Sequence, residues 1–190
     1  MLTRVPIRWI ALAVAVVLVG VTVVLAVQVG RRKAEVSLPR MVLEHEHAPN
    51  FTVKTLDGKT VTTAQLKNKT YVVNFFNSWC LPCQQEAAAL KSFYAEHKKE
   101  SDFEMIGVII DDTESTMRKY VKNNAIAYPV GVDPKGAASI DFGTTGQPET
   151  YVIAPDGVAV CGNLGASTQA QLDAWLQAAR SGQECVAPKK

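Results

Sequence analysis

The sequence predicts an α/β protein in which a central mixed β-sheet carries helices on both faces and is preceded by one transmembrane helix. Two observations support this prediction. Over residues 48–190, short runs of β-branched and aromatic residues alternate with longer segments of helical periodicity, an order typical of layered α/β folds. An uncharged apolar segment stands before them, near the amino terminus.

The apolar segment runs from Trp9 to Val29 without a charged residue. Its length matches the roughly 20 residues that cross a bilayer core as a helix. We therefore expect a cytoplasmic amino terminus at residues 1–8, an anchor at 9–29, a linker at 30–47 and one folded domain at 48–190. A cleaved signal peptide is the alternative, although its apolar core normally spans only about 7–15 residues. Basic residues flank the segment on both sides, so the flanking charges leave its orientation undecided.

The net charge of +2 conceals an uneven distribution. Residues 1–33 hold five basic residues and no acidic one, which leaves 15 basic against 18 acidic residues in the rest of the chain. A mildly acidic domain without a basic patch gives no reason to expect nucleic acid as a partner.

Turn residues and periodicity give the expected order of the elements. Asp57-Gly58 and Pro155-Asp156-Gly157 each separate two short strand-like runs and predict hairpins. Asp111 and Asp112 are acids suited to the start of the helix that follows them. We expect strands at residues 51–54, 59–61, 71–76, 103–110, 128–132, 150–154 and 158–161, and helices at 80–99, 114–124, 134–142 and 168–180.

Cys80 and Cys83 form the motif that carries the most specific chemistry. Residues three apart share one face of a helix's first turn, so the two side chains can close a disulfide. A strand that leads to Trp79 and a helix that starts near Cys80 place the first sulfur at a helix amino terminus, where free amides and the helix dipole stabilise a thiolate. The pattern indicates dithiol–disulfide exchange, with Cys80 as nucleophile and Cys83 as resolving cysteine. Pro82 fits the first turn, where its missing amide hydrogen costs nothing.

An isolated Cys-x-x-Cys also occurs as half of a zinc site or as a static disulfide. No second Cys-x-x-Cys or Cys/His pair follows at zinc-ligand spacing, and His45 and His47 fall in the expected linker. We therefore expect neither a metal nor another cofactor.

Two longer motifs resemble the TlpA/ResA family of membrane-anchored thioredoxin-like proteins, and are most similar to its DsbE/CcmG members. The first runs from Asn74 to Glu86 and contains Trp79-Cys80-Leu81-Pro82-Cys83; the second is Gly146-Gln147-Pro148-Glu149-Thr150-Tyr151. With Ala48-Pro49-Asn50-Phe51, the similarity spans about residues 48–181. It implies a thioredoxin-like fold. Asn74 stands where thioredoxin itself carries an aspartate, which favours the specialised branch.

The resemblance also implies roles for residues near the cysteines. Glu86, one helical turn beyond Cys83, would tune pKa values or relay protons during exchange. Pro148 would be cis and face the Cys80 sulfur, and the backbone of Gln147 would pair with an extended substrate. The remaining residues that we expect to contact substrate are Trp79, Pro82 and Glu149.

Cys161 and Cys185 lie outside the shared motifs. Cys161 ends the last expected hairpin and Cys185 follows the last helix, so we expect a structural disulfide that holds the carboxyl-terminal tail. Four cysteines allow three connectivities, and the sequence excludes none of them.

The resemblance implies a function in cytochrome c maturation. The protein would reduce the haem-binding cysteines of apocytochrome c, or of a similar exported protein, with electrons from an integral membrane thiol carrier. Oxidation of exported proteins is the alternative, because the direction depends on reduction potentials. A copper-delivery module would need a third ligand beside the cysteines. A thiol peroxidase would need Pro and Thr where this chain has Val73 and Asn77. The exchange chemistry and the four cysteines suit an oxidising compartment, so we expect a single-pass protein of the cell membrane with its domain on the extracytoplasmic face.

Overall fold

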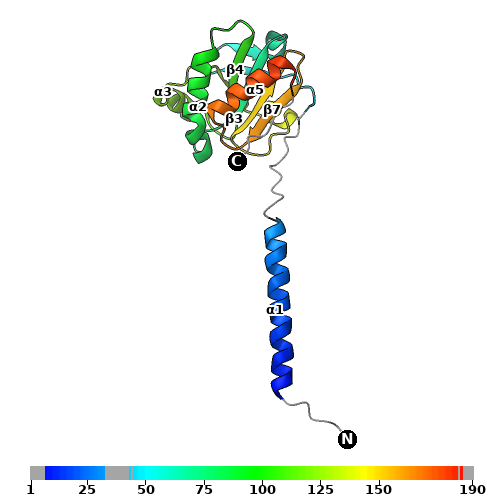
Figure 1. Cartoon of the computed structure of the whole chain (residues 1–190). Helices are drawn as coiled ribbons and strands as arrows, with labels where there is room; N and C mark the ends of the chain where they lie inside the picture. The colour runs from blue at the N-terminus through cyan, green and yellow to red at the C-terminus, as the bar shows by residue number, and fades with distance from the viewer. Residues whose placement is uncertain (1–6, 33–42, 44, 184, 186–190) are drawn as a thin grey trace. The chain divides into compact units, whose positions relative to one another are not determined.

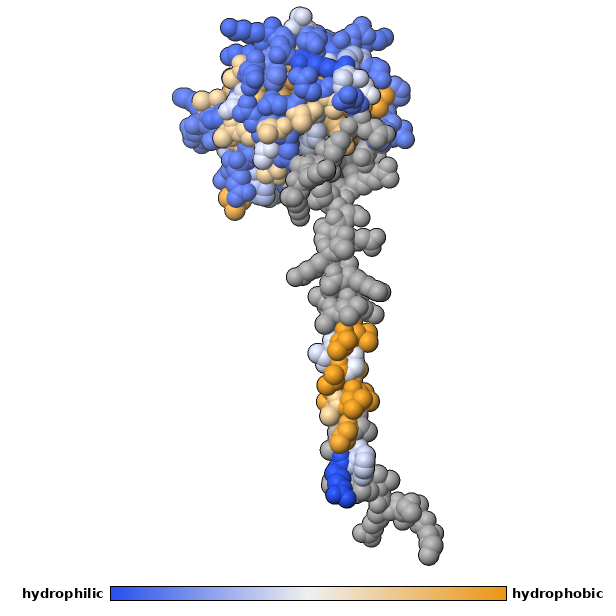
Figure 2. All heavy atoms as spheres, viewed as in Figure 1, coloured by the Kyte–Doolittle hydropathy of each residue, from blue (hydrophilic) through white to orange (hydrophobic). Residues whose placement is uncertain are grey.

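The computed structural model describes residues 7–32, 43, 45–183 and 185, which fall into two units, Met1–Arg40 and Met41–Lys190. The first unit contains one helix, α1, over Ile7–Arg32. It includes the expected apolar segment, and Figure 2 shows the apolar side chains exposed along it. A search of the described residues finds no helix that is both long and apolar enough to cross a membrane. The anchor therefore stays a prediction, and most of the expected linker lies outside the described residues.

The second unit is built on a seven-stranded mixed sheet with the strand order β2-β1-β5-β4-β3-β6-β7. The three strands β3, β4 and β5 are parallel, whereas β1, β6 and β7 pair antiparallel to their neighbours. The strands are β1 (Thr52–Thr55), β2 (Thr60–Thr62), β3 (Thr70–Phe76), β4 (Phe103–Ile109), β5 (Val130–Val132), β6 (Glu149–Ile153) and β7 (Ala159–Leu164).

Helices cover both faces of this sheet, as the sequence predicts (Figure 1). One core cluster joins the sheet to residues of α2, α3 and α5, among them Phe93, Met117 and Leu176. The other joins it to residues of η1 and α4, among them Leu66 and Ala138. The helices are η1 (Thr63–Leu66), α2 (Leu81–His97), α3 (Glu114–Asn123), α4 (Ala137–Asp141) and α5 (Gln169–Ser181).

The central strand β3 positions the site. All seven of its residues are buried, and it pairs with β4 on one side and β6 on the other. A strand that is buried on both faces consists mainly of apolar, aromatic and β-branched residues, and the sequence of β3 fits this pattern. Because β3 ends at Phe76, the segment from Asn77 to Cys80 leaves the sheet at the carboxyl end of the parallel strands, where α/β folds bind their ligands.

The domain starts a few residues before the expected boundary at residue 48. His45 N–H donates to Ala159 O at 2.8 Å, and Ala159 N–H donates to Glu46 O at 2.9 Å. His47 also forms an isolated bridge with Val158. These residues extend the sheet edge, and a sequence without strand periodicity gives no signal for such irregular pairing.

The structure joins Cys161 and Cys185 in a disulfide, with Cα atoms 5.6 Å apart. Cys161 lies on β7 and is buried in the core cluster beneath α5. The bond therefore ties the segment after α5 to the sheet, the arrangement that we expect from the positions of the two residues.

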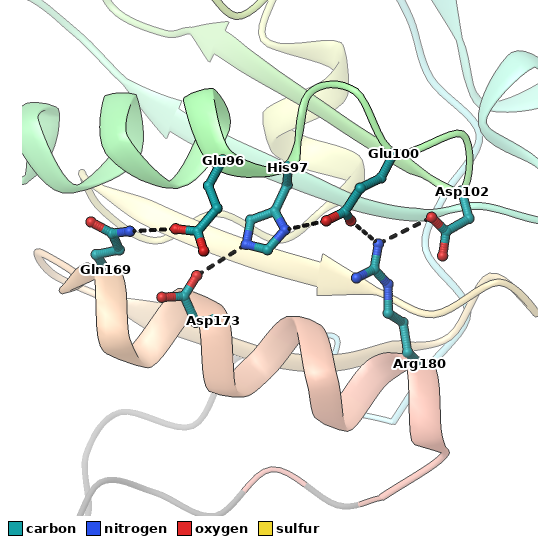
Figure 3. Close-up of polar contacts among 7 residues, drawn as sticks. All are labelled: Glu96, His97, Glu100, Asp102, Gln169, Asp173 and Arg180. Atoms are coloured by element: carbon teal, nitrogen blue, oxygen red, sulfur yellow. Dashed lines mark hydrogen bonds and ion pairs between the residues drawn. The ribbon is translucent and has the colours of Figure 1, made fainter.

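A buried histidine connects α2 to α5 (Figure 3). His97, 7% exposed, places Nδ1 2.9 Å from Glu100 Oε1 and Nε2 3.1 Å from Asp173 Oδ1. Arg180 of α5 pairs with Glu100 and with Asp102. Burial by itself lowers the pKa of His97, but the hydrogen bonds with Glu100 and Asp173 outweigh burial and raise the pKa above its usual 6.5.

Replacing His97 with Gln should therefore remove a pH-dependent part of the stability. Because the folded-state pKa is raised, the charged ring contributes fully below the unfolded-state pKa of about 6.5, and its contribution is lost as the pH rises through the folded-state value. At about pH 5.5 the variant should lose about 1.5–3 kcal/mol of the free energy of unfolding, the range for hydrogen bonds to charged groups. Urea titrations at about pH 5.5 and 8.5 measure this. Arg118→Gln, in an exposed ion pair of α3, is the pH-insensitive control, and equal losses for His97→Gln at both pH values would contradict the prediction.

Candidate active site

Cys80 and Cys83 form a disulfide at the amino terminus of α2, with Cα atoms 5.2 Å apart. Cys80 is the N-cap residue with extended backbone angles, and its Sγ accepts a hydrogen bond from Cys83 N–H at 3.1 Å. A free amide of the first turn therefore points at this sulfur, and in the reduced state this amide and the helix dipole favour its thiolate. Pro82 occupies the first turn of the helix, as the sequence predicts.

The disulfide is buried, but its neighbours in the chain are not. Cys80 is 6% and Cys83 2% exposed, whereas Trp79 is 62% and Leu81 64% exposed. Pro82 is also exposed. Exposed apolar side chains that gather in one patch can mark a site of protein–protein interaction. This surface can receive an apolar or extended segment of a partner beside the sulfur atoms.

Glu86 lies beneath the cysteine pair and is 2% exposed. Its Oε1 accepts a hydrogen bond from Asn74 Nδ2 at 2.8 Å, and its Oε2 accepts one from Ser167 N–H at 3.0 Å. Burial raises the pKa of Glu86 to about 7, although both hydrogen bonds act to lower it. A carboxyl group with this pKa can hold or release a proton near neutral pH. The sequence predicts this role for Glu86 through the resemblance, and the burial gives it a physical basis.

Two asparagines link the site to the sheet. Asn74, in the centre of β3, donates through Nδ2 to both Glu86 and Thr150 Oγ1, the latter at 2.9 Å. Asn77 Oδ1 accepts the N–H of Cys80 at 3.0 Å. Thr150 and Ser167 did not stand out in the sequence as site residues. Ser167 contributes a main-chain amide, for which no side-chain pattern exists.

The turn between β4 and α3 holds the segment that carries the nucleophile. Asp112 Oδ2 accepts hydrogen bonds from Ser78 N–H at 2.9 Å and from Ser78 Oγ–H at 2.6 Å. The two acids lie directly before α3, as the sequence predicts, and Thr113 is its N-cap residue. Only the pairing of β4 with β3 brings this turn to Ser78, so local sequence could not reveal the contact.

The peptide bond between Gln147 and Pro148 is cis, as the resemblance implies. Pro148 is buried and directly precedes β6, where Glu149 is paired with Phe75 of β3. The cis bond and the cysteine pair therefore lie at the same end of the sheet. The Gln147 side chain donates to Asp111 Oδ2 at 3.3 Å.

The expected contact of Glu149 with substrate is not compatible with the structure. Glu149 is 1% exposed, and its Oε2 accepts the N–H of Thr145 at 2.8 Å while Oε1 accepts the hydroxyl of Tyr151. The side chain is buried because β6 is an inner strand of the sheet and is covered on both faces, so all five of its residues are buried. Glu149 instead braces the loop that ends at the cis bond.

A groove of ≈ 910 Å³ opens beside the site. Gly146 and Gln147 line it next to the cis bond, and Asp111 and Asp112 line it next to the segment that carries the nucleophile. The groove therefore lies next to two parts of the site: the loop that ends at Pro148 and the turn that holds Ser78.

Within the described residues, one group of His, Cys, Asp or Glu side chains has the spacing of a metal site: Glu96, His97 and Asp173. Neither Cys80 nor Cys83 belongs to it. His97 and Asp173 are already paired with each other, and Glu96 accepts a hydrogen bond from Gln169 (Figure 3). The contacts of this group connect α2 to α5, and nothing in them supports the copper-delivery alternative.

Comparison with known proteins agrees with this geometry. The model of the AhpC/TSA family matches residues 45–160. Thiol-disulfide oxidoreductase ResA of a Bacillus cereus strain is 35% identical over 133 residues, which cover 70% of this chain and 76% of that protein. ResA of Bacillus subtilis is 25% identical over 180 residues, 95% of this chain and 96% of that protein. The crystal structure of a thiol:disulfide interchange protein of the thioredoxin family from Chlorobium tepidum TLS matches with a TM-score of 0.63 and 31% identity, covering 70% of this chain and 94% of that one.

The chain therefore belongs to the thioredoxin-like AhpC/TSA family. Its relatives and its Cys80–Cys83 pair at disulfide distance make it a thiol-disulfide oxidoreductase of the ResA type. Both the expected family and the expected enzyme class are confirmed. The structure places Asn77 in the position where a thiol peroxidase would need Thr, and its Oδ1 caps the N–H of Cys80.

The geometry accounts for each step of the exchange. In the reduced protein, the Cys80 thiolate attacks one sulfur of a substrate disulfide, forms a mixed disulfide and releases the other substrate sulfur as a thiolate. Cys83 loses its proton and attacks Cys80 Sγ, which forms the intramolecular disulfide and releases the second substrate thiolate. Two electrons pass from the protein to the substrate, and the reverse sequence oxidises a substrate dithiol. Glu86 can accept or supply a proton during the step at Cys83.

Replacing Glu86 with Gln should change how stability depends on pH. The folded-state pKa of about 7 lies above the ordinary value of 4.5, so between these pH values the folded protein binds the additional proton. The free energy of unfolding of the unmodified protein should therefore fall across this window, by up to ~3 kcal/mol, whereas Glu86→Gln lacks this fall. Urea titrations of the oxidised protein from about pH 4 to 8 measure the difference between the two. A difference that does not vary with pH would show that folding leaves the pKa of Glu86 at its ordinary value, and would contradict the prediction.

Proposed function

We propose that this oxidoreductase reduces the haem-binding cysteines of apocytochrome c during cytochrome c maturation. The observation that carries the proposal is a buried Cys80–Cys83 disulfide at the amino terminus of α2, beside exposed apolar side chains. The sequence motifs around it resemble those of the DsbE/CcmG proteins. The haem-binding segment of an apocytochrome presents two closely spaced cysteines in an extended chain. Such a segment can reach a sulfur that a folded substrate cannot approach.

The proposal includes an electron donor, because each reduction of a substrate leaves the Cys80–Cys83 pair oxidised. An integral membrane thiol carrier would return two electrons to the pair by the same exchange chemistry. Oxidation of exported proteins is the opposite use of this site, and the reduction potential of the pair relative to its partners decides between them.

Partner trapping tests the substrate. In Cys83→Ala, Cys80 can form a mixed disulfide that no resolving cysteine releases, so bound partners should accumulate and can be identified by mass spectrometry after purification under non-reducing conditions. Cys80→Ala is the matched control, because it keeps Cys83 but lacks the nucleophile at the start of α2. It should trap at least about tenfold less partner protein. Apocytochromes c among the trapped proteins support the proposal. A set of unrelated exported proteins without apocytochromes would contradict it and favour the oxidant.

We also propose that the domain lies on the extracytoplasmic face of the cell membrane, anchored by the apolar segment at residues 9–29. The proposal rests on the length and apolarity of this segment in the sequence and on the Cys161–Cys185 disulfide, because structural disulfides persist in oxidising compartments.

Labelling of intact cells tests this location. After mild reduction, a membrane-impermeant maleimide should label the full-length protein, and Cys80→Ser should show reduced labelling because it lacks the most reactive thiol. A cytoplasmic thiol protein in the same cells serves as the control for leakage. Absence of Cys80-dependent labelling in intact cells, with labelling after lysis, would contradict the proposed side of the membrane.

A further inference from the structure

One residue of the turn between β4 and α3 contacts both segments that surround the disulfide. The indole Nε1–H of Trp79 donates to the main-chain oxygen of Asp111 at 3.0 Å. The side-chain amide of Gln147 donates to Asp111 Oδ2 at 3.3 Å. Asp111 thus joins the residue that precedes the nucleophile to the residue that precedes the cis proline.

The backbone of Asp111 has a conformation that few residues adopt. Its φ of 51° lies in the left-handed region, which disfavours side chains other than glycine and is tolerated best by Asn and Asp. The neighbours on both sides fix it: Ile110 N–H donates to Phe76 O at 3.2 Å, and the Asp112 carboxylate holds Ser78. Non-glycine residues in this region often mark functional sites, where the surrounding structure maintains the strain.

The two side chains that Asp111 contacts lie where a partner must approach. The indole of Trp79 is 62% exposed, so packing alone leaves it considerable freedom. Gln147 and Asp111 both line the groove beside the site. A surface side chain that is already fixed loses less conformational entropy when a partner binds, and the complex is correspondingly tighter.

We propose that Asp111 is a positioning residue for exchange with protein partners: it holds the Trp79 indole and the Gln147 side chain in the arrangement that receives the partner's segment. Asp111 acts through these two residues and does not touch the reacting sulfur atoms. The inference depends on the exchange activity alone, so it stands or fails independently of the proposed apocytochrome substrate.

Two variants test the carboxylate of Asp111, and a third serves as the control. Asp111→Gly keeps the left-handed backbone without strain and removes the carboxylate that binds Gln147, whereas the main-chain oxygen that accepts the Trp79 indole is present in every variant. Asp111→Asn keeps both the tolerance for this backbone and a side-chain oxygen that can accept the hydrogen bond. Ala125→Gly is the matched control, because Ala125 is exposed, has a φ of 50° and follows α3. It relieves the same kind of strain without a contact to the site.

The experiment compares a protein disulfide with a small one. The full-length protein is reduced, freed of excess reductant and mixed with insulin or with dithiobis(nitrobenzoate), and initial rates over a range of substrate concentrations give a half-saturating concentration (KM) and a maximal rate (kcat) for each. Asp111→Gly should raise KM for insulin about tenfold, equivalent to ~1.4 kcal/mol of lost binding, and change kcat by less than about twofold. The small disulfide does not span both Trp79 and Gln147, so its KM should change far less. Asp111→Asn should restore the KM for insulin to within about twofold of the original value, and Ala125→Gly should leave both reactions unchanged.

A double-mutant cycle gives an independent measurement. If Asp111 acts through Gln147, then Gln147→Ala combined with Asp111→Gly should raise KM for insulin no further than the larger single effect. The inference is overturned if Asp111→Gly leaves the insulin KM unchanged, if it lowers kcat equally for both substrates, or if the two substitutions act additively.

Discussion

The junction between β3 and α2 is the constraint on which the rest of the site depends. A strand buried along its whole length ends at Phe76, and four residues later Cys80 caps a helix and accepts the N–H of Cys83 through its sulfur. The sheet fixes the start of this connection and the helix fixes its end. The sulfur therefore has one position relative to the carboxyl ends of the parallel strands. Every other part of the site either supports this connection or lies beside it.

A buried carboxyl group behind the disulfide shows what the junction requires of the core. Glu86 accepts hydrogen bonds from β3 through Asn74 and from the segment before α5 through Ser167. Burial of an ionised carboxylate is unfavourable, and the raised pKa records that cost. Two donors from separate elements keep the group in place in either protonation state. The His97 contacts further along α2 join the same two helices a second time, so α5 is fixed against α2 at two points.

The elements that follow from local pattern agree closely with the structure. The hairpin turns at Asp57-Gly58 and Pro155-Asp156-Gly157, the buried run of β3 and the helical spacing of α2 and α5 all occur where the sequence predicts them. Local chemistry decides these features: turn residues set the backbone angles, and periodicity sets which face is buried. The expected substrate contact of Glu149 failed because β6 is buried on both faces, which depends on the place of the strand in the sheet and not on the motif that contains Glu149.

The fold class, the redox pair and the chain position of the cis proline could all be predicted from the sequence. Each depends on residues that are neighbours in the chain or on a motif that the family shares. Which groups surround the redox pair became known only from the three-dimensional fold. Strand pairing and helix packing bring four residues that are distant in the chain close to the redox pair. Each lies more than 30 residues after Ser78 in the sequence: Asp111, Asp112, Thr150 and Ser167. Such contacts leave no periodic or local signal, since a hydrogen bond between distant segments depends on where the sheet places them and not on the residues beside them in the chain.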